Sequence, residues 1–193
     1  MTKHGRIQTM DKNKAYDISK YNFQEGENIF VDANIWLYLF PAPVNPNNKK
    51  LKIYSKEFAR MQGKNVNLFT DVLILSEYLN RYSRIEYEAN YKTNYPRYKD
   101  WRISQDFVNV GSIAANFTKQ ILKLSNLHDI SSSAFNMQEI INNFSVAKTD
   151  FNDAIFIEIC SKKSMKILTD DGDFKYGGIE IITANPSLLK DCK

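Results

Sequence analysis

Short apolar runs alternate with longer amphipathic stretches along most of the chain. Four runs rich in β-branched and aromatic residues have the pattern of buried strands, at residues 28–32, 65–69, 166–169 and 179–183. Between them, apolar residues recur near helical spacing, most extensively at residues 83–145. Strands that alternate with helices predict a parallel sheet covered on both faces, so the pattern indicates the α/β class.

The boundaries of this pattern suggest one domain with two additions. The 193-residue length suits a single domain. Residues 1–27 are polar with few apolar anchors, so we expect an N-terminal extension followed by a domain at residues 28–193. Within that domain, residues 83–145 form a helical elaboration in which basic and aromatic residues are frequent.

Composition removes several classes of function. The chain has two Cys and two His, too few for a zinc cage or an iron–sulfur site, and it leaves few residues for histidine- or cysteine-based catalysis. The apolar runs are shorter than the ~18 residues of a membrane helix, and the N-terminus lacks the apolar core of a signal peptide. We therefore expect a cytoplasmic protein that does not enter a membrane, with carboxylates as its reactive groups.

Acidic residues occur where the predicted strands end and where helices begin. An Asp at the exit of a buried strand is costly to ionise unless it is paired, hydrogen-bonded or bound to a metal. Side chains that follow the carboxyl ends of parallel strands lie at one edge of the sheet. Hard divalent cations prefer oxygen ligands, which carboxylates supply. A Mg²⁺ or Mn²⁺ site is therefore a credible interpretation of these acids. They are Asp32, Glu77, Asp150, Asp153, Asp170, Asp171 and Asp173.

The same acids also have purely structural interpretations. Asp32 and Asp150 could cap the helices that follow them, and residues 170–173 could form an ordinary turn. Glu77 could pair with Arg81 one helical turn later, although its neighbours on the preceding turn are apolar. Taken one at a time, each structural interpretation is the simpler one.

In their order along the chain, four motifs resemble the PIN domain family. They read IFVDANIW, LSEYLN, DFNDAIFIEIC and KILTDDGDF, and the resemblance runs from about residue 28 to 183. It implies a PIN-like domain built as a three-layer α/β/α sandwich, with a central parallel sheet of four to five strands. It also implies an endoribonuclease that depends on Mg²⁺ or Mn²⁺. Because many members are toxins of toxin–antitoxin pairs and dimers are common, a small antitoxin protein and a homodimer are implied as possible partners.

Matching the family's acids position by position assigns roles to individual residues. The resemblance implies four catalytic, metal-binding carboxylates, at Asp32, Glu77, Asp153 and Asp171. Asn34 and Thr169 would hydrogen-bond a ligand carboxylate or a water on the metal. Three neighbouring acids have open roles, namely Asp150, Asp170 and Asp173, of which Asp150 is the one best placed to share the role of Asp153.

An RNA substrate would also need positive charge near the acids. Residues 78–102 interleave Lys and Arg with Tyr and Trp, so cations could follow phosphates while aromatic faces stack on unpaired bases. Alternatively, the aromatics pack the helices of the elaboration itself and the basic residues are a solvated face. The RNA-binding candidates are Arg81, Arg84, Arg97 and Lys99.

Two other functions compete with the nuclease. A small-molecule phosphohydrolase with an aspartyl nucleophile would carry Asp-x-Asp after the first strand, whereas this chain has Asp32-Ala33-Asn34. A non-catalytic RNA- or protein-binding domain could retain the fold without turnover. The missing second Asp argues against the phosphohydrolase, and with all four matching acids present a loss of activity is not evident.

Overall fold

The centre of the protein is a six-stranded sheet in which all neighbours run parallel, in the order β1-β6-β5-β2-β3-β4. The structure, a computed structural model of the chain, describes residues 11–42, 48–145 and 149–193. The expected α/β class with a parallel sheet is confirmed, with six strands instead of four or five. The strands are β1 Lys14–Asp17, β2 Asn28–Val31, β3 Asn67–Thr70, β4 Asn126–Leu127, β5 Lys166–Leu168 and β6 Glu180–Thr183.

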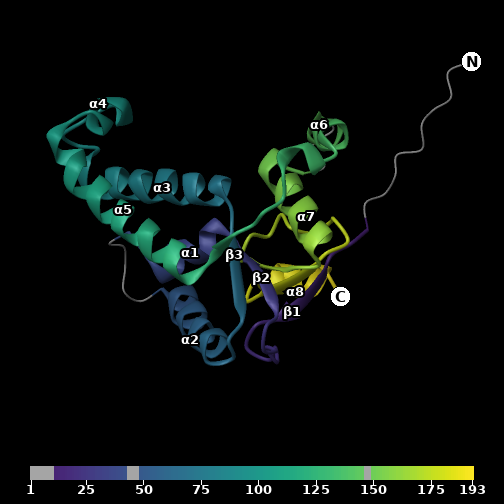
Figure 1. Cartoon of the computed structure of the whole chain (residues 1–193). Coiled ribbons are helices and arrows are strands. Elements are labelled where there is room, and N and C mark those ends of the chain that lie inside the picture. Colours follow the sequence, from purple (N-terminus) through teal and green to yellow (C-terminus); the bar gives the residue numbers. More distant parts are fainter. Residues whose placement is uncertain (1–10, 43–47, 146–148) are drawn as a thin grey trace, which may run out of the picture.

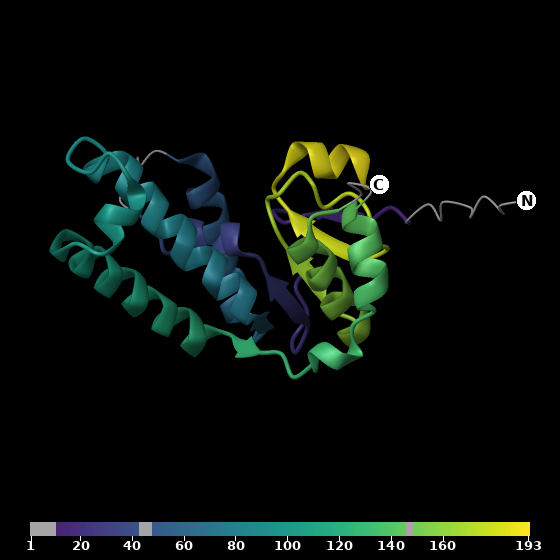
Figure 2. The same ribbon diagram turned by 90° about the horizontal axis from the view of Figure 1, so that it is seen from above.

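Helices cover both faces of this sheet (Figure 1). Helices α1, α2 and α3 pack together on one side, and α6 packs on α7 on the other, an arrangement that Figure 2 shows from above. None of the helices in the described ranges is long and apolar enough to cross a membrane. The helices are α1 Ala33–Leu39, α2 Lys49–Gly63, α3 Val72–Glu86, α4 Tyr98–Arg102, α5 Gln105–Leu124, α6 Met137–Ser145, α7 Phe151–Lys163 and α8 Pro186–Asp191.

The central strands owe their position to apolar residues on both faces. Ile29, Phe30 and Val31 of β2 are fully buried, as are Ile167 and Leu168 of β5. A parallel strand covered by helices on both sides has no solvent-facing positions, which is why its sequence is continuously apolar rather than alternating. This core fixes the carboxyl ends of β2 and β5 side by side, where Asp32 and residues 169–171 follow.

The segment expected to be an N-terminal extension adds a strand to the sheet. β1 pairs in parallel with β6, from Lys14 opposite Glu180 to Asp17 opposite Thr183. A strand of the sheet therefore precedes the expected domain boundary at residue 28, and residues 1–10 lie outside the described residues. Pairing with β6 depends on a partner more than 160 residues away, which no local pattern reveals.

The elaboration at residues 83–145 projects from the sheet as a helical arm. This arm consists of α3, the π-helix η1 at Tyr87–Tyr91, α4 and α5 (Figure 1). The rest of the expected elaboration lies elsewhere, because β4 joins the sheet and α6 packs on α7. Its aromatic residues pack on one another: Trp101 is fully buried, with the rings of Tyr91 and Phe107 both centred 5.1 Å from its own. For these aromatics, packing within the arm is the interpretation that the structure supports.

Candidate active site

Asp32 lies at the point where β2 ends and α1 begins, and the residue is only 4% exposed. Its Oδ1 accepts a hydrogen bond from the backbone N–H of Ala33 at 2.6 Å, which caps the helix. Its Oδ2 accepts from the Thr169 hydroxyl at 2.6 Å and from the Asn34 amide. The buried carboxylate is thus both a helix cap and a fixed acceptor at the edge of the sheet.

Thr169 and Asn34 connect the ends of β2 and β5. The Thr169 hydroxyl accepts from the Asn34 amide at 3.2 Å and from the backbone N–H of Asp171 at 3.0 Å. The Asn34 carbonyl oxygen accepts from the backbone N–H of Asp170 at 3.1 Å. These hydrogen bonds hold the backbone of the turn after β5, and they thereby set the position of Asp171 relative to Asp32.

Asp150 and Asp153 come from the start of α7. The Asp150 carboxylate accepts from the backbone N–H of Asn152 at 3.0 Å and caps the helix, as its structural interpretation predicted. Asp153 follows in the first turn and is partly buried. Three residues apart on one helix, both acids face the same space.

Glu77 lies on α3, across from the start of α7 that carries Asp150 and Asp153. Its carboxylate is 31% exposed and pairs with Arg81 at 3.1 Å, the pairing that its sequence spacing allowed. Neighbouring Arg84 belongs to the same face of the helix, with its guanidinium 4.6 Å from the centre of the Tyr98 ring. The helix thus presents an acid and two arginines together.

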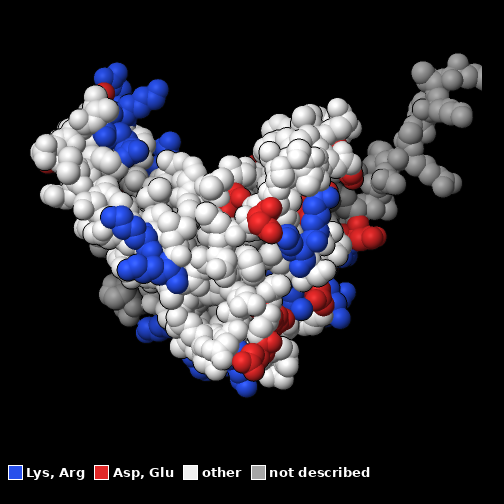
Figure 3. Space-filling view, viewed as in Figure 1, with Lys and Arg blue, Asp and Glu red and all other residues white. Residues whose placement is uncertain are grey.

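These side chains line an open cleft of about 540 Å³, called here the acidic cleft. Figure 3 shows a hollow between the helical arm and α6, with acidic side chains at its floor. Asp32 is not among the residues that form its walls. Its polar walls are made by Ser76, Glu77, Asn80, Arg81, Arg84, Asp150, Asn152, Asp153, Asp171 and Asp173.

Burial and mutual repulsion make the acids of this site hard to ionise. Burial raises the pKa of Asp32 to about 6 despite the opposing Thr169 hydrogen bond, and the charge of Glu77 contributes to the rise. Burial also raises the pKa of Asp153 to about 8, with further contributions from the charges of Asp32, Asp171, Asp150 and Glu77. A cation among these groups would relieve both effects.

The donor set fits a hard divalent cation. Among the residues that the structure describes, no group of three or more His, Cys, Asp or Glu side chains is arranged to hold a metal ion on its own. Mg²⁺, however, usually keeps several waters and takes only one or two protein carboxylates, and Mn²⁺ also favours oxygen ligands. Repelling carboxylates around an open cleft match this mode of binding.

Comparison with known families identifies the fold. The family model described as PIN domain matches residues 29–178. The chain belongs to the PIN domain family. Its members are generally nucleases that use divalent metal ions.

Solved structures give a more distant similarity. The PIN domain described here is similar to the protein in "Crystal Structure of PAE2754 from Pyrobaculum aerophilum", with 12% sequence identity and a TM-score of 0.45. That similarity covers 80% of this chain and 90% of the other. No curated protein matches the chain.

Asp170 is turned away from the acidic cleft of this PIN domain. Its carboxylate accepts from the Lys50 ammonium at 2.6 Å and from the hydroxyls of Tyr54 at 2.8 Å and Tyr38 at 3.1 Å. Lys50 also donates to the backbone oxygen of Ala184 at 3.0 Å. Asp170 therefore ties α1 and α2 to the ends of β5 and β6. The sequence analysis missed Lys50 and Tyr54 because they meet Asp170 across more than 110 residues of chain.

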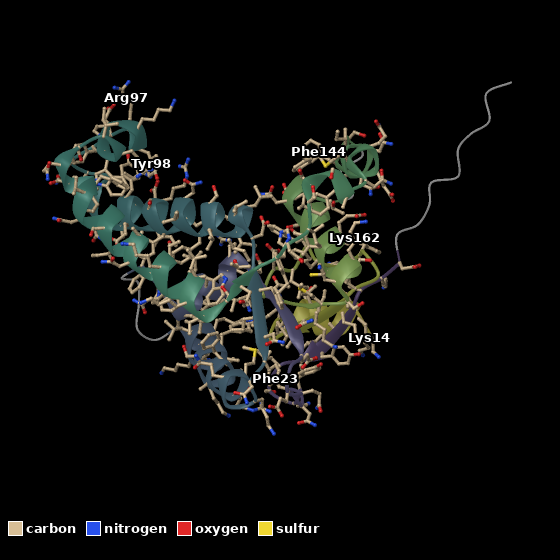
Figure 4. The ribbon with its side chains drawn as sticks, viewed as in Figure 1. Lys14, Phe23, Arg97, Tyr98, Phe144 and Lys162 are labelled. Carbon is tan, nitrogen blue, oxygen red and sulfur yellow. The ribbon has the colours of Figure 1, made fainter. Side chains whose placement is uncertain are left out.

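The four basic candidates for RNA contact divide into two pairs. Arg81 and Arg84 line the acidic cleft, whereas Arg97 and Lys99 do not. Arg97 lies at the start of α4, where its guanidinium pairs with Asp100 at 2.8 and 3.0 Å. Figure 4 shows Arg97 at the outer end of the helical arm.

Proposed function

We propose that this PIN domain is an endoribonuclease that depends on Mg²⁺ or Mn²⁺. One observation carries the proposal. Acids from three separate elements, Glu77, Asp153 and Asp171, surround one open cleft, with the buried Asp32 at the end of the adjacent strand. Structural caps and surface pairs alone would not need to gather like charges in one place.

The residues at and beside the cleft would have different roles in the reaction. One or two of Asp32, Glu77, Asp153 and Asp171 would bind the metal directly, and the others would hold it through its waters. A bound Mg²⁺ or Mn²⁺ supplies positive charge for the phosphate oxygens and lowers the pKa of a water. Thr169 and Asn34 orient the Asp32 carboxylate through the hydrogen bonds described above.

The arginines on α3 supply the attraction for the substrate. Arg81 and Arg84 stand on the wall opposite Asp150 and Asp153, where they would neutralise backbone phosphates on either side of the cleaved bond. Arg97 and Lys99 would meet a strand that continues along the arm. An open cleft between two projecting parts admits a polymer, which favours RNA over an enclosed small molecule.

The central test is cleavage of a labelled single-stranded RNA in the presence of Mn²⁺. We expect Asp32→Asn and Asp153→Asn each to lower the cleavage rate by about 100-fold or more, the scale of losing a group that stabilises the transition state. A matched control is Asp106→Asn, which changes an exposed acid on α5 outside the cleft and should leave the rate unchanged.

Two results would contradict the nuclease proposal. One is cleavage that continues in EDTA, and the other is full activity in both cleft variants. RNA binding without metal and without cleavage would instead support the alternative, a non-catalytic binding domain. A toxin role with a small antitoxin partner, and a homodimer, are proposed on the family resemblance alone.

A further inference from the structure

A second cavity, of about 610 Å³, adjoins the acidic cleft. The two spaces share three of the acids, Asp150, Asp153 and Asp173. The second cavity therefore lies next to the place where a scissile phosphate would bind, and its lining residues do not include the arginines of α3. Its remaining walls come from Phe144, Thr149, Lys175 and Tyr176.

Two aromatic rings stand exposed in this space, which is called here the aromatic subsite. Phe144, at the end of α6, is 55% exposed, and Tyr176, in the loop between β5 and β6, is 44% exposed. Figure 4 shows Phe144 on α6, on the part of the molecule that faces the helical arm across the hollow. Large apolar rings exposed together beside charged groups are typical of a surface that binds a ligand with apolar faces.

The backbone that carries Tyr176 is held firmly in place. The buried side chain of Asn13 donates to the backbone oxygens of Phe174 at 3.3 Å and Tyr176 at 3.1 Å. The next two residues, Gly177 and Gly178, both donate from their backbone N–H groups to the oxygen of Asp11. Both glycines have positive φ angles of 137° and 69°, so the loop has a conformation reserved for glycine. A ring on such a fixed backbone loses little entropy when a ligand stacks on it.

We propose that Phe144 and Tyr176 bind an unpaired nucleobase of the RNA strand whose phosphate lies at the acids. This inference rests on the proposed function and specifies its substrate as single-stranded. A base joined to a phosphate at Asp153 needs a neighbouring space with an aromatic wall, and the aromatic subsite, which shares Asp153 with the acidic cleft, provides it. A base inside a duplex is already stacked and paired, so it could enter only after unstacking. Stacking tolerates every base, since each has a π-face, and the subsite selects for single strands more than for sequence.

The main competitor is a protein that docks on α6. Met137, Ile141 and Phe144 are all exposed and recur at helical spacing, so they form an apolar stripe. Tyr176, however, belongs to a different element, and only Phe144 of the stripe lines the aromatic subsite. The shared acids also favour a nucleotide over an apolar protein surface. Ile141 is 50% exposed on the same helix and outside the subsite, which makes it a matched control.

The experiment measures stacking directly and does not depend on turnover. In an Asp32→Asn background, in which cleavage is slowed and the walls of the subsite are unchanged, single-stranded RNAs carry 2-aminopurine at successive positions, and fluorescence reports its stacking. We expect strong quenching at one or two positions. Phe144→Leu and Tyr176→Leu should each abolish most of it and weaken RNA binding by about ten-fold, whereas Tyr176→Phe retains the ring and the quenching. Ile141→Ala should behave like the background protein.

The outcomes separate this inference from the nuclease proposal. Unchanged quenching and affinity in both Leu variants would overturn the subsite, and cleavage by the unmodified protein would leave the nuclease standing. No cleavage, together with quenching that the Leu variants lose, would support the subsite and reject the nuclease. Failure of the folded background protein to bind any of the RNAs would overturn the subsite, as would an equal loss of RNA binding in Ile141→Ala.

Discussion

Asp32 illustrates how one side chain in this protein serves both stability and chemistry. One of its oxygens caps α1 while the other is held by Thr169 and Asn34. Burial of a carboxylate costs free energy, which three hydrogen-bond donors partly offset by favouring its charged form. The structural and catalytic interpretations of this acid are therefore compatible, and the same holds for Glu77, which pairs with Arg81 at the wall of the cleft.

Removing the Thr169 hydroxyl tests this arrangement at the scale of one atom. We expect Thr169→Val to lower the free energy of unfolding by about 2 kcal/mol, because a buried carboxylate loses a donor and the N–H of Asp171 loses its acceptor. The lost bond normally lowers the pKa of Asp32, so that pKa should rise further above about 6. The acidic limb of the cleavage profile should then move to higher pH.

Urea unfolding and a pH profile of cleavage measure these two effects. Thr169→Ser keeps the hydroxyl and should behave nearly as the unmodified protein in both measurements. A Val variant that unfolds at the same urea concentration as the Ser variant would show that the hydroxyl does not hold Asp32 in the way described.

At the scale of elements, β1 supports the site from the far edge of the sheet. Asn13, directly before β1, is almost fully buried and bonds the loop between β5 and β6 at three points. Its amide donates to the oxygens of Phe174 and Tyr176, and its oxygen accepts from the N–H of Ile179 at 2.9 Å. One side chain therefore connects the N-terminal strand to the loop that carries the aromatic subsite.

Truncating this side chain should affect stability strongly. We expect Asn13→Ala to lower the free energy of unfolding by about 3 kcal/mol, since three backbone groups, in two buried hydrogen bonds and one part-buried one, lose their partner at once. The exposed Asn22 provides the control, and Asn22→Ala should change stability by less than about 0.5 kcal/mol. Urea unfolding of both variants measures these changes in stability. Equal unfolding midpoints would refute the structural role assigned to Asn13.

The elements that the sequence predicts well are those whose apolar runs are buried on both faces. Strands β2, β3, β5 and β6 all lie within two residues of their expected ranges. β1 and β4 escaped prediction because β1 is polar in part and pairs with a distant partner, and β4 has two exposed residues. Asp32 and the acids after β5 could be located because strand ends are local features, whereas the roles of Glu77 and Asp153 came from the family resemblance. Contacts such as Lys50 with Asp170, or a cavity between Phe144 and Tyr176, depend on tertiary neighbours that no local pattern contains.

At the scale of the whole molecule, charge is distributed unevenly. The net charge is +4, yet acids outnumber bases among the residues that line the acidic cleft, and its two arginines, Arg81 and Arg84, both come from α3. Without a cation, the acids of this site repel one another when they are ionised. The free energy of unfolding therefore depends on their protonation. Functional sites often carry this kind of cost in stability.

The linkage has a definite sign. Because the pKa values of Asp32 and Asp153 rise from 3.8 to about 6 and about 8, the metal-free folded state retains protons that the unfolded chain has lost. The free energy of unfolding should therefore fall as pH rises from about 4 to about 8. Metal ions bind deprotonated carboxylates, so stabilisation by Mn²⁺ should grow over the same window.

Thermal unfolding at pH 5.5 and pH 8, with and without Mn²⁺, tests this linkage in the intact protein. Saturating Mn²⁺ at about 100 times its dissociation constant should add about 2.7 kcal/mol at pH 8 and much less at pH 5.5. Asp153→Asn removes one repelling charge, so it should stabilise the metal-free protein by about 2 kcal/mol at pH 8 and lose most of the response to Mn²⁺. The Asp106→Asn control should retain both the pH dependence and the response. A Mn²⁺ shift of equal size at the two pH values, or one undiminished in Asp153→Asn, would place the metal away from these carboxylates.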